Sequence, residues 1–209
     1  MHHRDLNSLR QGIYWLRGGI RRVLNGFRDR AAARNLRHRD FEYFLVPLQV
    51  HLDSQISHSN FRDVAEFIEF VVRSFALNAA KTSNLVLKLH PLDRPYRDYR
   101  ALVEALRLKY DLGSRLHYVD VVNLPEALQC ALGTVVINST VGLSSLLRHT
   151  PTKCLGRAIY DIPGLTHQGP LDEFWKAPAP VDAALLERFV TFVRTNTQLA
   201  GSVWRGFAH

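Results

Sequence analysis

Long apolar runs are missing from this chain of 209 residues. No segment approaches eighteen consecutive apolar residues, so the sequence predicts no transmembrane helix. The opening residues Met1-His2-His3-Arg4 are not followed by the short apolar core and small-residue cleavage site of a secretory signal. An apolar fraction of 46% and a charged fraction of 22% favour a globular protein.

Cysteine is scarce. Cys130 and Cys154 are the only two, and neither belongs to a CxxC motif or a histidine-rich neighbourhood. This pattern predicts two reduced thiols in the core of a cytoplasmic protein rather than disulfides. His51 and His58 have no clear carboxylate or cysteine partner nearby in the sequence, so we expect no metal site. We also expect no bound cofactor.

Residues 1–40 lack lysine and contain few acids. Ten arginines and three aspartates give this segment a net charge of +7. Residues 41–209 hold 17 basic and 16 acidic side chains, a net charge of +1. The chain therefore consists of a basic segment, 1–40, that leads into a nearly neutral domain, 41–209.

Apolar residues recur in steps of three and four within the basic segment, which predicts one apolar helical face. They are Leu6, Leu9, Ile13, Leu16, Ile20, Val23 and Phe27. Three explanations are open for this helix. Its face packs on this domain or on a further one, it lies on an anionic membrane surface, or it binds nucleic acid. The last is the weakest, because no aromatic platform or DNA-binding motif accompanies the charge, and we expect no nucleic-acid partner.

Short apolar runs alternate with helical periods from residue 42 onward. The runs predict strands over Tyr43–Leu48, Leu85–Leu89, Arg115–Val119, Thr134–Ile137 and Thr152–Leu155. The periods predict helices over 60–80, Tyr96–Tyr110, Leu124–Ala131, Val141–Arg148 and Asp182–Asn196, the first capped by Asn60. This alternation predicts an α/β fold, a Rossmann-like parallel sheet flanked by helices.

Polar residues follow three of the predicted strands. Gln49 and Asp53 follow the first, His90 follows the second, and 138–140 follow the fourth. Ligands of such sheets bind beyond the carboxyl ends of the strands, so the three loops predict one site. Asp53 is suited to act as nucleophile or general base, although a loop aspartate also commonly caps a turn.

Lys88 and His90 lie two residues apart on a strand, so their side chains share a face. Together they could balance a phosphate or a carboxylate, or else be a solvated lysine and a hydrogen-bonded histidine. The segment Asn138-Ser139-Thr140 precedes a helix, whose first N–H groups could hold an anion. Gly142 would permit close approach of the backbone. The alternative is an ordinary Ser/Thr helix cap.

Five segments in order resemble the capsule polysaccharide biosynthesis proteins of Gram-negative bacteria. They are PLQVHLDSQ (47–55), LVLKLHPLD (85–93), VVINSTVGLSSLLRHTPTKCLG (135–156), AIYDIPGLTHQGPLDEFW (158–175) and TQLAGSVW (197–204). Proteins of this family are two-domain, GT-B-like transferases that use CMP-Kdo to build a Kdo linker on phosphatidylglycerol. Full members are about twice as long as this chain. The resemblance implies that residues 41–209 are the nucleotide-sugar half and that the helical segment 1–40 is the connector between the two halves.

The resemblance also implies roles for individual residues. Asp53 matches the nucleophile of retaining transfer, and Gln49 matches the glutamine of the same Gln-x-x-x-Asp segment. His90, Ser139 and Thr140 match positions expected to hold the cytidine monophosphate, with Lys88 a weaker member of that set. The implied partners are CMP-Kdo, a phosphatidylglycerol-linked acceptor, the capsule synthesis and export complex, and the inner membrane surface.

Two other functions remain open from the sequence. The first is a non-catalytic interaction module of the capsule synthesis and export complex, which would act through the basic helix. The second is an epimerase or transferase that uses a UDP-sugar, because the fold alone does not determine the function.

Overall fold

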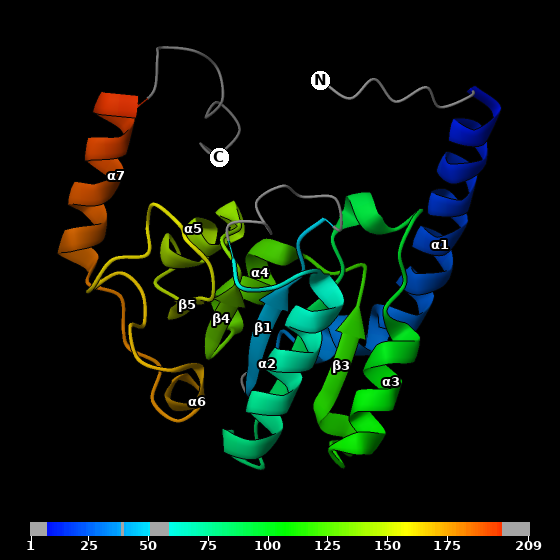
Figure 1. The fold of residues 1–209 in the computed structure, drawn as a ribbon, viewed down its shortest axis with the longest axis horizontal. Helices are drawn as coiled ribbons and strands as arrows, with labels where there is room; N and C mark the ends of the chain where they lie inside the picture. Colours follow the sequence, from blue (N-terminus) through cyan, green and yellow to red (C-terminus); the bar gives the residue numbers. More distant parts are fainter. Residues whose placement is uncertain (1–7, 39, 51–58, 198–209) are drawn as a thin grey trace.

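The computed structural model describes residues 8–38, 40–50 and 59–197. Its centre is a parallel five-stranded sheet in the order β3-β2-β1-β4-β5 (Figure 1). The strands are β1 (Tyr43–Pro47), β2 (Asn84–Lys88), β3 (Leu116–Val119), β4 (Gly133–Val136) and β5 (Thr152–Cys154). The chain moves outward from β1 to β3 and then crosses back to β4, so the strand order reverses between β1 and β4. The predicted α/β fold with a Rossmann-like sheet is confirmed.

Helices cover both faces of the sheet. The helices α2 (Val64–Asn78) and α3 (Arg100–Lys109) pack on one face, where α6 (Leu171–Phe174) contacts α2. The other face is covered by α4 (Leu124–Cys130) and α5 (Thr140–Leu146). The helix α7 (Ala183–Thr197) contributes Leu186 to the buried cluster that also contains Leu146 of α5 and Val136 of β4. Two 3₁₀ turns, η2 (Pro91–Asp93) and η3 (Gly113–Arg115), complete the connections.

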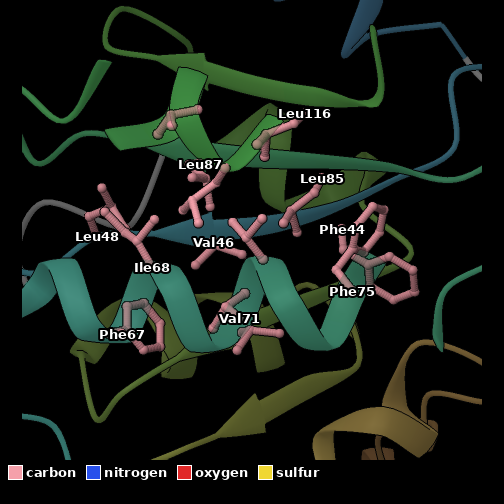
Figure 2. Close-up of a cluster of buried hydrophobic side chains, with 14 of the residues drawn as sticks. Phe44, Val46, Leu48, Phe67, Ile68, Val71, Phe75, Leu85, Leu87 and Leu116 are labelled. Carbon is pink, nitrogen blue, oxygen red and sulfur yellow. The ribbon is translucent and has the colours of Figure 1, made fainter. Parts of the chain in front are cut away.

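The strands are apolar on both sides because both faces are covered. In β1, Phe44 and Val46 point into the cluster under α2, whereas Tyr43 and Leu45 point to the α4 side. Figure 2 shows the first cluster, in which side chains of β1 and β2 meet those of α2. Burial of these side chains fixes the strands, and with them the loops that follow the strands.

All five strands and the predicted helices are present in the expected order, but two helices begin later than expected. Asp63, not Asn60, caps α2: its carboxylate accepts a hydrogen bond from the N–H of Glu66 at 2.9 Å. A charged acceptor at this place also complements the helix dipole. The third helix begins at Arg100 instead of Tyr96, because the N–H groups of Tyr96 and Arg97 both bond to Asp93 in the turn after η2.

The basic segment forms α1 (Ser8–Asn35), a helix that runs alongside the β3 edge of the sheet (Figure 1). Packing of the apolar face on this domain is one of the explanations open from the sequence, but the side chains of that face are exposed: Leu16, Ile20, Val23 and Phe27 are 52–67% accessible. Among the α1 side chains that the structure describes, the buried ones are Asn25 and Asp29. The helical period was therefore predicted correctly, but a polar stripe contacts this domain.

Both cysteines are free thiols, as expected, but only Cys154 lies in the core, whereas Cys130 is exposed near the end of α4. Among the residues that the structure describes, no helix has the length and apolar character needed to span a bilayer.

Candidate functional site

A pocket of about 510 Å³ opens above the carboxyl ends of β1, β2 and β3. It extends to Val141 in the first turn of α5 and therefore lies next to the reversal of strand order between β1 and β4. Its lining residues are Arg22, Pro47, Leu48, Lys88, Leu89, His90, Pro91, Arg94, Asp120, Val121, Val122, Leu124 and Val141. Ligands of doubly wound sheets bind at this place. The pocket contains the predicted Lys88 and His90.

Lys88 is the last residue of β2 and is only 6% exposed. Its Nζ donates to the backbone oxygen of Leu89 at 2.8 Å and to that of Asp120 at 3.4 Å. Burial lowers the pKa of Lys88 to about 8, although the nearby Asp120 carboxylate acts against this shift. Lys88 is therefore still mainly a cation at neutral pH, and two backbone carbonyls hold it at the pocket wall.

Arg94 and Asp120 form a buried ion pair at the same wall. The guanidinium donates through Nε to Oδ2 at 2.8 Å and through Nη2 to Oδ1 at 2.7 Å, a two-pronged contact. The Asp120 side chain is fully buried. Burial alone would raise the pKa of Asp120, but hydrogen bonds from Arg94 and Asn25 outweigh it and hold the pKa below its usual value. Asp120 is thus charged, and its charge is matched by Arg94.

The helix α1 supplies the remaining partners of this pair. Asn25 Nδ2 donates to Asp120 Oδ2 at 2.9 Å. Asp29 Oδ2 accepts from the backbone N–H of Asp120 at 2.6 Å and of Val121 at 2.8 Å. Burial raises the pKa of Asp29, and these two N–H groups partly oppose the shift. Arg22, one turn before Asn25, lines the pocket. The basic helix is therefore a wall of the site.

The predicted residues after β1 and β4 are brought together. Gln49 is buried, and its Nε2 donates to Asn138 Oδ1 at 2.9 Å. This bond joins the loop after β1 to the loop after β4. His90 accepts a hydrogen bond from the N–H of Leu92 through Nδ1 at 3.2 Å and so caps η2. The His90 ring also lines the pocket.

Ser139 caps α5 in the ordinary way, since its hydroxyl accepts from the N–H of Val141 at 3.2 Å. Thr140 is exposed at the first position of that helix. Gly142 is buried against Tyr160: a Cβ at this position would lie 2.8 Å from two carbons of the Tyr160 ring. Tyr160 also donates to the carbonyl of Ser139. The space beside Gly142 is thus occupied by this chain.

Asp53 lies outside the described residues, as do His51 and His58. Its role as nucleophile remains a prediction. Sequence reasoning missed Arg22, Asn25, Asp29, Arg94 and Asp120. Two signals could have indicated part of this set: Arg94 closely follows the Lys88–His90 segment, and Asp120 directly follows the third predicted strand. Asn25 and Asp29 contact partners 95 and 91 residues away, and periodicity carries no information on such pairs.

Comparison with known proteins places these observations in a family. A sequence profile described as "Capsule polysaccharide biosynthesis protein" matches residues 1–204, so the match includes α1. The chain is 40% identical over 200 residues to the capsule polysaccharide export protein KpsS of Escherichia coli, covering 95% of this chain and 51% of KpsS. It is 38% identical over 207 residues to the capsule polysaccharide modification protein LipB of Neisseria meningitidis serogroup A, covering 98% and 49%.

Among solved structures, the beta Kdo 2,7 transferase KpsC of Thermosulfurimonas dismutans matches with a TM-score of 0.45 and 21% identity. That match covers 76% of this chain and 52% of KpsC. The chain spans about half the length of the curated relatives it matches. From the extent of the profile match and the identity to KpsS and LipB, the chain belongs to the capsule polysaccharide biosynthesis protein family.

Proposed function

We propose that this chain is the donor-binding half of a GT-B-type capsule glycosyltransferase and that its pocket binds CMP-Kdo. The observation that carries the proposal is the pocket at the carboxyl ends of β1–β3, with three cationic side chains in its wall. Arg22, Lys88 and Arg94 are set against one carboxylate, that of Asp120. Because Arg94 already neutralises Asp120, the surplus positive charge suits a donor that carries both a phosphate and a carboxylate.

Lys88 and Arg22 would contact the anionic groups of the donor, and His90 would contact its phosphate. Asn138 would keep Gln49 fixed at the start of the loop that leads to Asp53. In this proposal the α5 N-terminus takes a smaller part than expected from the sequence, because Ser139 is engaged as a cap and Gly142 is covered by Tyr160.

Asp53 is the proposed nucleophile of a retaining transfer. Its carboxylate would attack the anomeric carbon of Kdo, and CMP would leave with the electron pair of the broken carbon–oxygen bond. A hydroxyl of a phosphatidylglycerol-linked acceptor, losing its proton, would then displace Asp53 from the same carbon. Two inversions give net retention of configuration. The proposal for Asp53 rests on the Gln-x-x-x-Asp match between Gln49 and Asp53.

The first test is a calorimetric titration with CMP, CMP-Kdo and a UDP-sugar. We expect CMP and CMP-Kdo to bind and the UDP-sugar to bind more weakly. Replacing Lys88 with methionine should reduce CMP affinity about tenfold or more, because a charge-assisted hydrogen bond is lost. Lys81→Met is the matched control, since Lys81 is exposed before the amino end of β2. Tighter binding of the UDP-sugar would instead favour a UDP-sugar enzyme.

The second test is intact-mass measurement after incubation with CMP-Kdo. A covalent Kdo adduct is expected on the native chain and should be absent from Asp53→Asn. Asp40→Asn, which changes an exposed carboxylate before β1, should keep the adduct. An adduct that survives Asp53→Asn would place the nucleophile elsewhere. Absence of both nucleotide binding and an adduct would favour a non-catalytic module of the capsule synthesis and export complex.

A further inference from the structure

The helix α1 has two faces of opposite character. Asn25 and Asp29 lie on the face toward the sheet, and both are buried. On the opposite face, the large apolar side chains are more than half exposed. They are Leu16 (67%), Ile20 (52%), Val23 (59%), Leu24 (54%) and Phe27 (59%). In a soluble protein an apolar stripe normally faces the core, so this helix is oriented the other way round.

Buried hydrogen bonds fix this orientation. Asp29 accepts from two backbone N–H groups at the end of β3, and Asn25 donates to Asp120. Arg21 adds a bond from Nη1 to the carbonyl of Arg94 at 3.0 Å. A rotation that turned the apolar stripe inward would strip a buried carboxylate and two buried N–H groups of their partners, which is costly. The apolar face therefore stays directed outward.

The charges exposed on the described side chains of α1 are all positive. Arg17, Arg30 and Arg34 are exposed on the side away from the pocket, and Arg22 is exposed at the pocket, whereas the single acid of the helix, Asp29, is buried against the sheet. The guanidinium of Arg30 lies 4.2 Å from the centre of the Phe27 ring, at the border of the apolar stripe. An apolar stripe bordered by arginines is the pattern of a helix that lies in the interface of an anionic bilayer.

We propose that the outward face of α1 binds the surface of a bilayer that contains anionic lipid. Leu16, Ile20 and Phe27 would enter the headgroup–acyl boundary, and the arginines would contact lipid phosphates. A bilayer offers an apolar layer beside an anionic layer along the whole exposed stripe from Leu16 to Phe27, about 17 Å at 1.5 Å per residue. A polypeptide partner would need an acidic rim matched to each arginine. Charge complementarity therefore favours the lipid surface.

The use of this surface rests on the proposed function. Arg22 belongs to α1 and lines the pocket, so a bilayer under α1 would bring the donor site near the plane in which a lipid-linked acceptor resides. The binding itself does not require that the pocket hold CMP-Kdo. Failure of one proposal can therefore be told from failure of the other.

The test is co-sedimentation of the whole chain with phosphatidylcholine vesicles that either contain or lack phosphatidylglycerol. Binding is expected only with phosphatidylglycerol and should weaken steeply with salt. The double variant Leu16→Glu/Phe27→Glu should bind at least about tenfold more weakly, because it places charge in the apolar layer. Leu108→Glu/Phe192→Glu, at equally exposed sites on α3 and α7, is the matched control and should bind as the native chain does.

Arginine variants separate the contribution of charge to vesicle binding from that of the inserted apolar side chains. Arg17→Gln and Arg30→Gln should each weaken binding about fivefold and reduce the salt dependence. Equal binding to both vesicle types, or no effect of Leu16→Glu/Phe27→Glu, would overturn the proposal. So would a dimer that this double variant abolishes, seen by light scattering without vesicle binding, since the face would then join two chains. CMP titration of the double variant should match that of the native chain, which keeps the two proposals separate.

Discussion

The carboxylate of Asp29 accepts hydrogen bonds from the backbone N–H groups of both Asp120 and Val121, so one side chain of α1 holds the carboxyl end of β3. Replacing Asp29 with alanine should lower the free energy of unfolding by about 2 kcal/mol or more, because two N–H groups lose their acceptor. Asp29→Asn should cost much less, since its amide oxygen can occupy the same place. Urea denaturation measures both. Equal losses for the two variants would mean that the acceptor geometry is unimportant.

Anion binding at the pocket should depend on the protonation of Lys88. Burial brings its pKa to about 8, so CMP affinity should fall as the pH rises from 7 to 9. The same shift has the opposite effect on the free protein. The folded pKa of about 8 lies below the ordinary value of 10.5, so unfolding takes up a proton between these two values, and the free energy of unfolding rises as the pH rises from about 8 to 10.5. CMP titrations and urea denaturation at several pH values should each show this pH dependence, and Lys88→Met should remove it from both the CMP affinity and the free energy of unfolding.

Arg94 should matter for stability as well as for ligand binding. In Arg94→Ala the Asp120 carboxylate stays buried without its cation, which typically costs about 3 kcal/mol. Adding Asp120→Asn to Arg94→Ala should restore part of the loss, because the buried carboxylate that lost its cation is then removed. Arg62→Ala breaks the exposed pair with Glu66 and should have little effect on urea denaturation. If Arg94→Ala behaved like Arg62→Ala, the buried pair would contribute nothing to the fold.

A substitution at Gly142 distinguishes two roles of this residue, packing against Tyr160 and close approach to a ligand. A methyl group there would overlap the Tyr160 ring, so Gly142→Ala should destabilise the protein by about 1–3 kcal/mol. Gly19→Ala is the control, because nothing lies within 4 Å of its added carbon and a helix interior gains from alanine. The thermal midpoints of the two variants should move in opposite directions. If Gly142→Ala were as stable as the native chain but no longer bound CMP, Gly142 would instead serve close approach of the backbone to the ligand.

The sequence was sufficient for the sheet, because buried parallel strands are continuous apolar runs such as Tyr43–Pro47. Helix starts were less certain, since several polar residues near Asn60 could cap α2, and the choice of Asp63 depends on backbone geometry. The loops that follow β1, β2 and β4 were identified from the placement of Gln49, His90 and Asn138.

The orientation of α1 could not be predicted in the same way. Periodicity located its apolar stripe but could not tell whether the stripe packs on this domain, on a further one or on a membrane surface. What decides the orientation is the bonding of Asn25 and Asp29 to residues more than ninety positions away. Arg94 and Asp120 were missed for a related reason: each is an unremarkable loop residue until the fold places them together.

The bonds of Asp29 and Asn25 to the β3 end have a thermodynamic consequence. They join the wall that contains Arg94 to a helix whose far side is exposed, so the proposed nucleotide in the pocket and the proposed lipid at the outward face would act on one shared network. Coupling between two binding equilibria is reciprocal. If a bound nucleotide changes the affinity for lipid by some factor, bound lipid must change the affinity for the nucleotide by the same factor. Asp29→Ala, which breaks the shared network, should bring this factor toward one for both ligands.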